Sequence, residues 1–429
     1  MENTEFTPGV RAALVSVVTR DRTEEEAKAS LEELRRLLET AGGEAVFVMM
    51  QNKETPDVRT YLGSGKAAEL CYYCATNEAD LAVFDCELSP SQIRNLEEVL
   101  GENVRVIDRS MLILDIFALH ATSGEGKLQV ELAQLKYTAP RLMGKGASLS
   151  RLGGGIGTRG PGESQLETDR RHLSRRVQML ERSLAELAAD RKTQRQARDR
   201  SGLARVAIVG YTNAGKSTLL NYLTDAGILA KDKLFATLDP TTRKCRLPGG
   251  ETILLTDTVG FIRNLPHHLV HAFRSTLDEA VYADLVLIVI DASDPEASAQ
   301  LKVTEEILES LGAGGKPTLY VFNKCDLGVA HPGMAHGKEH VAYISAATGQ
   351  GVEEMLVRVE EMLHEGSRRV TFFIPNSEQR HLSKLYSSGT VETVEYGADG
   401  VSVTAVVDAQ LYGQLRDFDT APRKEEEDE

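Results

Sequence analysis

Residues 206–218 read Val-Ala-Ile-Val-Gly-Tyr-Thr-Asn-Ala-Gly-Lys-Ser-Thr, and this stretch decides the fold. The apolar run at 206–209 predicts a buried strand, and a helical pattern resumes at Ser217. Gly210, Gly215, Lys216 and Ser217 fit the G-x-x-x-x-G-K-[ST] phosphate loop. Glycines let the backbone turn its N–H groups onto phosphate oxygens, while Lys216 supplies a charge near the β- and γ-phosphates. The following helix adds its positive end. The alternative is a glycine-rich turn without a ligand.

We therefore expect a nucleotide and Mg²⁺ at this loop, with the Ser217 hydroxyl on the metal. The predicted phosphate-binding residues are Gly210, Tyr211, Thr212, Asn213, Ala214, Gly215, Lys216, Ser217 and Thr218.

Three downstream motifs indicate which nucleotide is bound. Asp257-Thr258-Val259-Gly260 follows an apolar run, where an aspartate linked to Mg²⁺ through water and a γ-phosphate-sensing glycine belong. Asn323-Lys324-Cys325-Asp326 ends the next apolar run; its carboxylate can accept from N1–H and the exocyclic amine of guanine. Adenine lacks that amine, so an unpaired partner would penalise ATP. Ser345-Ala346-Ala347 matches the segment that touches the guanine carbonyl through its backbone. Their order and spacing predict a GTPase domain.

The first switch segment is expected at Phe235-Ala236-Thr237-Leu238-Asp239-Pro240, between the phosphate loop and Asp257. We predict that Thr237 gives Mg²⁺ its second protein hydroxyl, with Thr241 and Thr242 as alternatives. The predicted metal site is thus Ser217, Thr237 and, through water, Asp257. The predicted catalytic residues are Lys216, Thr237 and Gly260.

The residue after Gly260 is Phe261, where many GTPases carry a water-orienting glutamine. A phenylalanine cannot hold water by hydrogen bonding, so intrinsic turnover should be slow, about 10⁻⁴ to 10⁻³ s⁻¹, until a partner supplies the missing groups. Alternatively, Phe261 is a packing residue and the backbone positions the water; the two readings are compatible.

Asn213 resembles the phosphate-loop asparagine of several potassium-activated GTPases, in which its side-chain oxygen binds a monovalent cation. K⁺ is accordingly a candidate cofactor, placed to neutralise charge between the β- and γ-phosphates. The alternative is that Asn213 only tolerates an unusual backbone conformation.

The whole chain has 429 residues, a formal net charge of −15 and five cysteines. This length predicts several domains, and the charge argues against a wholly basic nucleic-acid coat. Irregularly spaced cysteines, including a lone Cys71-x-x-Cys74, suggest a reducing compartment. No signal peptide opens the chain and no apolar run approaches the roughly 20 residues of a membrane helix, so we expect a cytoplasmic protein without membrane insertion, monomeric when free.

Residues 1–121 alternate short apolar runs (12–18, 44–50, 81–84 and 104–107) with helical patterns, which predicts a parallel α/β domain. Thr23 with Glu26, and Ser89 with Pro90, mark two helix starts. Gly63-Ser64-Gly65-Lys66 resembles a truncated phosphate loop. We interpret it as a turn before a helix, with phosphate binding as the alternative.

Residues 122–202 predict an antiparallel helical coiled-coil linker. Leu128, Leu132 and Leu135, and then Leu173, Val177, Leu180, Leu184 and Leu187, repeat at four-three spacing. A glycine-rich stretch at 151–163 separates them. Basic residues surround it, and in an acidic protein they favour RNA over the alternative of a solvated connector. The predicted RNA-binding residues are Arg141, Lys145, Arg151, Arg159, Arg170 and Arg171.

The GTPase domain is predicted at 203–366, a small α+β domain at 367–420 and a disordered acidic tail at 421–429.

Taken together, the chain resembles the HflX family of ribosome-associated GTPases over essentially its full length. The resemblance rests on residues 153–163 with 167–171, on 210–217 and on 235–241. It implies this four-part α/β multidomain architecture and binding to the large ribosomal subunit, with GTP-dependent splitting or rescue of stalled ribosomes. The alternative is a GTP-timed, rRNA-binding assembly factor. Some members are reported to hydrolyse ATP at the N-terminal domain, but residues 1–120 hold no complete nucleotide motif that supports this here.

Overall fold

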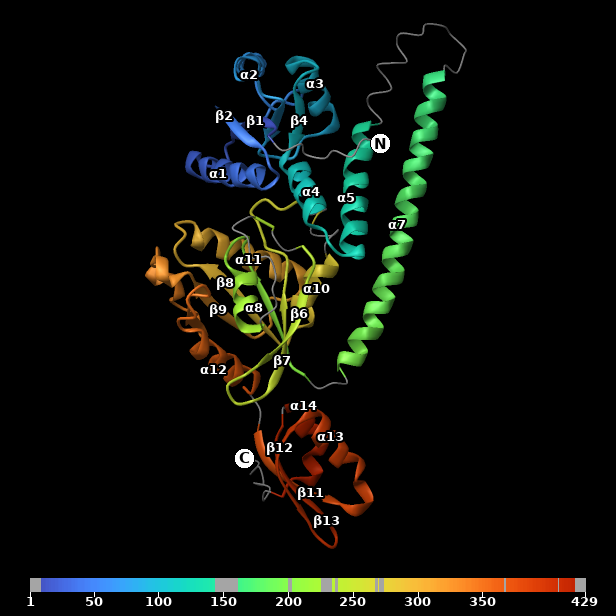
Figure 1. The fold of residues 1–429 in the computed structure, drawn as a ribbon, viewed down its shortest axis with the longest axis vertical. Helices are drawn as coiled ribbons and strands as arrows, with labels where there is room; N and C mark the ends of the chain where they lie inside the picture. Colours follow the sequence, from blue (N-terminus) through green and yellow to red (C-terminus); the bar gives the residue numbers. More distant parts are fainter. Residues whose placement is uncertain are drawn as a thin grey trace, which may run out of the picture.

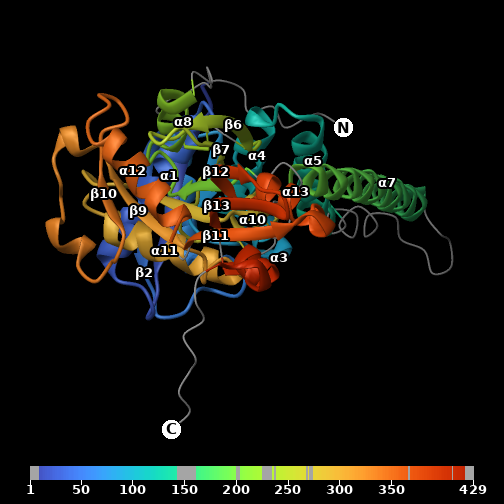
Figure 2. The ribbon, with the colours of Figure 1, turned by 90° about the horizontal axis from the view of Figure 1, so that it is seen from below.

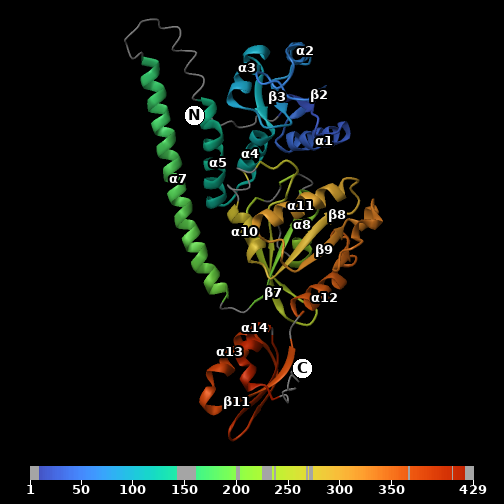
Figure 3. The ribbon, with the colours of Figure 1, turned by 180° about the vertical axis from the view of Figure 1, so that it is seen from behind.

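The computed structural model describes residues 9–142, 161–199, 203–224, 234–235, 238–266, 269, 274–365, 368–407 and 409–420. These residues form three sheets and a helical hairpin (Figure 1). The N-terminal sheet and the C-terminal sheet lie at opposite ends of the molecule, with the largest sheet between them, as the view from behind also shows (Figure 3). Within the described ranges, no helix combines the length and apolar character needed to cross a membrane.

The N-terminal sheet is parallel, in the order β2-β1-β3-β4. Its central strand β1 has six consecutive buried residues, as expected where helices cover both faces of a parallel sheet. The predicted capping boxes at Thr23 and Ser89 are both present. Cys71 and Cys74 pack against the core of this domain. The strands are β1 (Arg11–Val18), β2 (Glu44–Asn52), β3 (Leu81–Phe84) and β4 (Arg105–Asp108). The helices are α1 (Glu24–Thr40), α2 (Ser64–Thr76), α3 (Pro90–Leu100) and α4 (Arg109–His120).

The hairpin consists of α5 (Gly124–Leu142) and α7 (Pro161–Asp199), which run side by side in opposite directions (Figures 1 and 3). Leu173 and Leu180 are buried in the predicted seam, and the Arg176 guanidinium donates to the Glu131 carboxylate across it at 2.6 and 2.7 Å. Seen from below, α7 extends to one side of the rest of the molecule (Figure 2). The predicted antiparallel helical linker is confirmed.

The GTPase domain has a six-stranded sheet in the order β10-β9-β8-β5-β7-β6. All neighbours are parallel except β6, an edge strand antiparallel to β7 that the sequence did not predict. The strands are β5 (Arg205–Gly210), β6 (Thr241–Arg246), β7 (Thr252–Asp257), β8 (Leu285–Asp291), β9 (Thr318–Asn323) and β10 (Val341–Tyr343). The helices are α8 (Lys216–Thr224), α10 (Arg274–Tyr282), α11 (Ala297–Leu311) and α12 (Val352–Leu363).

The small C-terminal unit is an antiparallel sheet in the order β11-β13-β12, with a core of its own that includes Phe372 and Leu385. A 3₁₀ turn at Asn376–Glu378 precedes its first helix, which begins at Arg380. Its elements are β11 (Arg368–Pro375), α13 (Arg380–Ser388), β12 (Thr390–Tyr396), β13 (Gly400–Val407) and α14 (Ala409–Leu415).

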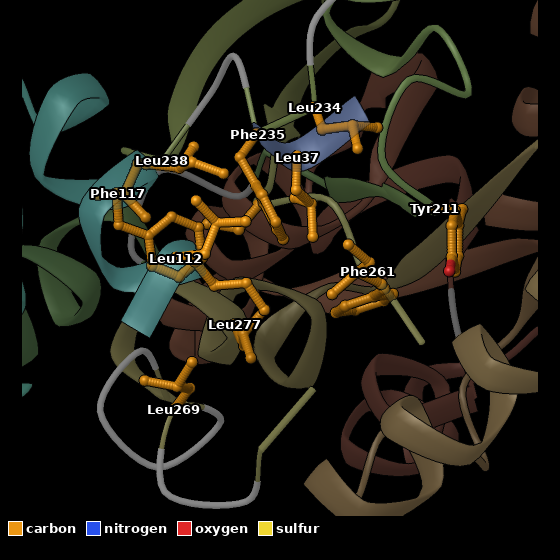
Figure 4. Close-up of a cluster of buried hydrophobic side chains, with 14 of the residues drawn as sticks. Leu37, Leu112, Phe117, Tyr211, Leu234, Phe235, Leu238, Phe261, Leu269 and Leu277 are labelled. Carbon is orange, nitrogen blue, oxygen red and sulfur yellow. The ribbon is translucent and has the colours of Figure 1, made fainter. Parts of the chain in front are cut away.

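One hydrophobic core joins the N-terminal domain to the GTPase domain. Figure 4 shows Leu112 and Phe117 of α4 facing side chains of the GTPase domain. The rings of Phe117 and Phe235 meet edge to face with centroids 4.7 Å apart. The buried GTPase-domain members of this shared core include Leu234, Phe235, Leu238, Phe261, Leu269 and Leu277.

Candidate active site

The phosphate loop leaves β5 at Gly210 and enters α8 at Lys216, as the sequence predicts. Gly210 has φ +145° and Gly215 φ +96°, conformations that favour glycine. A Cβ at Gly215 would lie 2.2 Å from the Asn323 amide nitrogen, so the loop and the base-recognition motif are in close contact. Asn213 has φ +61°, which supports the reading that it tolerates an unusual backbone.

Lys216 is buried at the centre of the site. Its ammonium donates to the carbonyl oxygens of Gly210 at 3.2 Å and Tyr211 at 2.8 Å. Burial lowers the pKa of Lys216 to about 8, although the nearby Asp257 carboxylate favours the charged form. A Cβ on Gly260 would lie 2.9 Å from this ammonium. The charge that would meet the γ-phosphate and the glycine that would sense it are therefore adjacent.

The predicted metal ligands Ser217 and Asp257 are brought together, because the Ser217 hydroxyl donates to the Asp257 carboxylate at 2.6 Å. Asp257 ends β7 and is fully buried. Its neighbour Thr258 fixes the chain direction by donating its hydroxyl to the Ile208 carbonyl at 2.8 Å. A serine hydroxyl beside a carboxylate is a set of hard oxygen donors, the type that Mg²⁺ prefers.

Asn323 links the base-recognition segments to the phosphate loop. Its amide donates to the Ala214 carbonyl at 2.8 Å and accepts from the Ala346 N–H at 2.9 Å. Lys324 takes a left-handed conformation and pairs with Asp291 at 2.7 Å. Asp326 follows with an exposed side chain. Ser345, Ala346 and Ala347 follow β10 after one intervening residue, with the first two buried and the third exposed.

Phe261 is 1% exposed and packs in the shared core (Figure 4). Its backbone pairs with the phosphate loop: Phe261 N donates to Gly210 O at 3.0 Å, and Thr212 N donates to Phe261 O at 2.8 Å. Phe261 is therefore a packing residue, and its backbone joins the segment that follows Gly260 to the phosphate loop.

The described residues of the first switch segment face the N-terminal domain and the start of the hairpin. Phe235 and Leu238 are buried in the shared core, and the Asp239 carboxylate is held by Thr122 and Ser123. Ala236 and Thr237 lie outside the described residues.

The two alternatives to Thr237 both lie in β6. Thr241 is opposite Asp257 in the ladder, and Thr242 shares a hydroxyl–hydroxyl hydrogen bond of 3.0 Å with Thr256.

A buried polar network next to the phosphate loop was not predicted. The Tyr211 hydroxyl bonds to Glu33 of α1 and accepts from the Arg263 N–H at 2.7 Å. Arg109 of α4 bonds to Glu33, to the Asp85 carboxylate at 2.9 Å and to the Arg263 carbonyl at 3.2 Å. The Tyr211 side chain thus faces the N-terminal domain, and only its backbone is available to phosphates.

The predicted RNA-binding residues are only partly described. Arg170 and Arg171 are exposed on α7. Arg141 lies near the end of α5, and nothing is described of its side chain. Lys145, Arg151 and Arg159 lie outside the described residues.

Comparison with known proteins agrees with this geometry. Three family descriptions match: "GTP-binding GTPase N-terminal" at residues 28–118, "GTP-binding GTPase Middle Region" at 120–198 and "50S ribosome-binding GTPase" at 205–324. The chain is 50% identical to GTPase HflX of Lacrimispora saccharolytica over 95% of this chain and 96% of that protein. It is 42% identical to GTPase HflX of Escherichia coli over 92% of each. The order of the phosphate loop, the Asp257–Gly260 motif and the Asn323–Asp326 motif on the fold described above, together with this similarity over 95% of the chain, identifies the chain as a GTP-hydrolysing member of the HflX family.

Proposed function

We propose that the chain binds the large ribosomal subunit in the cytoplasm. With GTP bound, it separates ribosomal subunits or rescues stalled ribosomes, and GTP hydrolysis then returns the protein to its starting state. The observation that carries this proposal is the hairpin. Arg170 and Arg171 are exposed on α7, close in sequence to the basic glycine-rich stretch, in a chain of formal net charge −15. Such a local basic surface favours a phosphate-rich partner. The match to "50S ribosome-binding GTPase" supports the same partner.

In the proposed nucleotide site, residues 210–218 cradle the phosphates and Asp326 recognises guanine. Ser217 would hold Mg²⁺ directly, Asp257 would hold it through water, and Thr237 would complete the protein ligands. Mg²⁺ would neutralise charge between the β- and γ-phosphates. Lys216, Gly260 and Thr237 are the proposed catalytic residues. K⁺ beside Asn213 is a further proposed cofactor.

Sedimentation of intact ribosomes through sucrose tests the proposal. With GTP or a non-hydrolysable analogue, the protein should convert ribosomes into separate subunits, and GDP should not. If the protein binds free large subunits or precursor particles but leaves intact ribosomes unchanged, the assembly-factor alternative replaces this proposal.

The double variant Arg151→Glu, Arg159→Glu tests whether the hairpin contributes to ribosome binding. This variant should co-sediment less with large subunits at unchanged GTP affinity, and its binding should depend less on salt because fewer phosphates are neutralised. Equal co-sedimentation would remove the glycine-rich stretch from the interface.

A further inference from the structure

Within the described part of the first switch segment, the Asp239 side chain hydrogen-bonds to the start of the hairpin. Its carboxylate accepts from Thr122 N at 3.0 Å, Thr122 Oγ1 at 2.8 Å and Ser123 N at 2.7 Å, and also from the Ser123 hydroxyl. Four hydrogen-bond donors, two from Thr122 and two from Ser123, therefore converge on this one carboxylate.

These contacts coincide with the beginning of α5. The Ser123 hydroxyl accepts from Gly126 N at 2.8 Å and so caps the helix. The Asp239 charge lies at the same N-terminus, where the helix dipole favours an anion. The first switch segment thus completes the cap of a helix that belongs to a different part of the chain.

We propose that Asp239 couples the nucleotide state of the first switch segment to the position of the α5–α7 hairpin. The inference rests on the proposed role of Thr237 as a Mg²⁺ ligand. Thr237 and Asp239 are two positions apart, and two residues of extended chain span at most roughly 7 Å, so Mg²⁺ binding by Thr237 would confine Asp239 to within that distance of it. Because four donors hold that carboxylate, the start of α5 follows, and α7 moves with α5 through the seam and the Arg176–Glu131 pair.

Gly126 offers a sharp test. A Cβ at this position would lie 2.4 Å from Asp239 Oδ1 and 3.0 Å from the Ser123 hydroxyl, so Gly126→Ala displaces the carboxylate. Alanine also has a higher helix propensity than glycine, so the substitution does not weaken α5 through propensity. Gly124→Ala is the matched control, because a Cβ there meets nothing within 4 Å on the same first turn.

The measurement is Förster resonance energy transfer between two dyes, one at Met179 on α7 and one at Val357 on α12. Both positions are exposed. The dyes are attached through genetically encoded non-natural residues, so that the native cysteines need not be replaced. In the parent, transfer should differ between GDP and a non-hydrolysable GTP analogue. Gly126→Ala should lose this difference, and Gly124→Ala should keep it, all three binding the analogue equally.

The coupling is overturned if the parent gives the same transfer in both nucleotides, or if Gly126→Ala retains the parent's difference. The sedimentation assay is independent of this outcome. A parent that shifts with nucleotide but leaves ribosomes intact contradicts the proposed function and leaves the coupling standing.

Discussion

Asp326 is the residue on which base selection depends. Its side chain is exposed in the 3₁₀ turn that follows β9, and the amide of the nearby Asn323 is held by hydrogen bonds to Ala214 and Ala346. Asp326→Asn should weaken GTP binding roughly 10- to 100-fold, because asparagine keeps one acceptor oxygen but loses the other hydrogen bond to a charged group, worth about 1.5 to 3 kcal/mol. The new amide can instead donate to the extra carbonyl of xanthine. Competition of GTP and XTP against a fluorescent nucleotide measures the change, and a variant that still prefers GTP would refute the assigned role.

The hypothesis that K⁺ is a cofactor depends on the single residue Asn213. Hydrolysis should be faster in K⁺ than in Na⁺ at equal ionic strength, and removal of the Asn213 amide should abolish the difference. Because Asn213 has φ +61°, Asn213→Gly is the better variant, since glycine keeps that backbone without strain. Equal rates in both salts for the parent protein, measured with and without large subunits, would end the hypothesis and leave the GTPase activity intact.

Individual residues differ in how far sequence could place them. Lys216, Ser217, Asp257 and Asn323 belong to motifs whose spacing fixes their geometry, and the structure brings them together. The Tyr211–Glu33 bond joins positions 178 residues apart. No local pattern distinguishes Glu33 from any other glutamate on an amphipathic helix, so this network required the structure.

Helix α4 carries a buried acid whose effect on stability should change with pH. Burial raises the pKa of Asp115 to about 7, even though the Gln134 amide donates to it at 3.2 Å. The folded protein therefore binds a proton that the unfolded chain releases near pH 4. The free energy of unfolding should fall as pH rises from about 4 to 7 and level off above.

Asp115→Asn removes this dependence, since the amide stays neutral and its carbonyl can still accept from Gln134. It should raise the free energy of unfolding by up to about 4 kcal/mol at pH 8 and by little at pH 4, given about 1.4 kcal/mol for each of about three pKa units. Urea denaturation at both pH values measures it, with the exposed Asp21→Asn as control. A gain that is equal at both pH values would contradict the explanation.

Whole elements were predicted where periodicity was strong. The four-three leucine pattern anticipated the α5–α7 seam, and apolar runs anticipated nearly every parallel strand. Strand β6 was not predicted, because Cys245 is the one buried residue among its six. Backbone hydrogen bonds to β7 hold it in the sheet, so its sequence does not show the alternation of apolar and polar residues that marks a strand.

At the scale of the whole molecule, the shared core should decide how the protein unfolds. Phe117→Ala should lower the free energy of unfolding by about 3 to 5 kcal/mol. The buried ring packs against Phe235, so its removal leaves a cavity in the shared core. Calorimetry should show one transition for the N-terminal and GTPase domains that moves to lower temperature in this variant. The transition of the C-terminal unit, whose core is separate, should stay in place. Two transitions for the first two domains, of which the variant shifts only one, would contradict a common core.

That shared core also limits which parts of such a chain can be exchanged between relatives by recombination. A crossover near residues 366–367 separates two independent cores and would yield a workable hybrid. A crossover near 200–204 would pair Phe235, Leu238 and Phe261 with a foreign α4 surface. Substitutions on one side would then need compensating substitutions on the other, so the N-terminal and GTPase domains are expected to be inherited as a single unit.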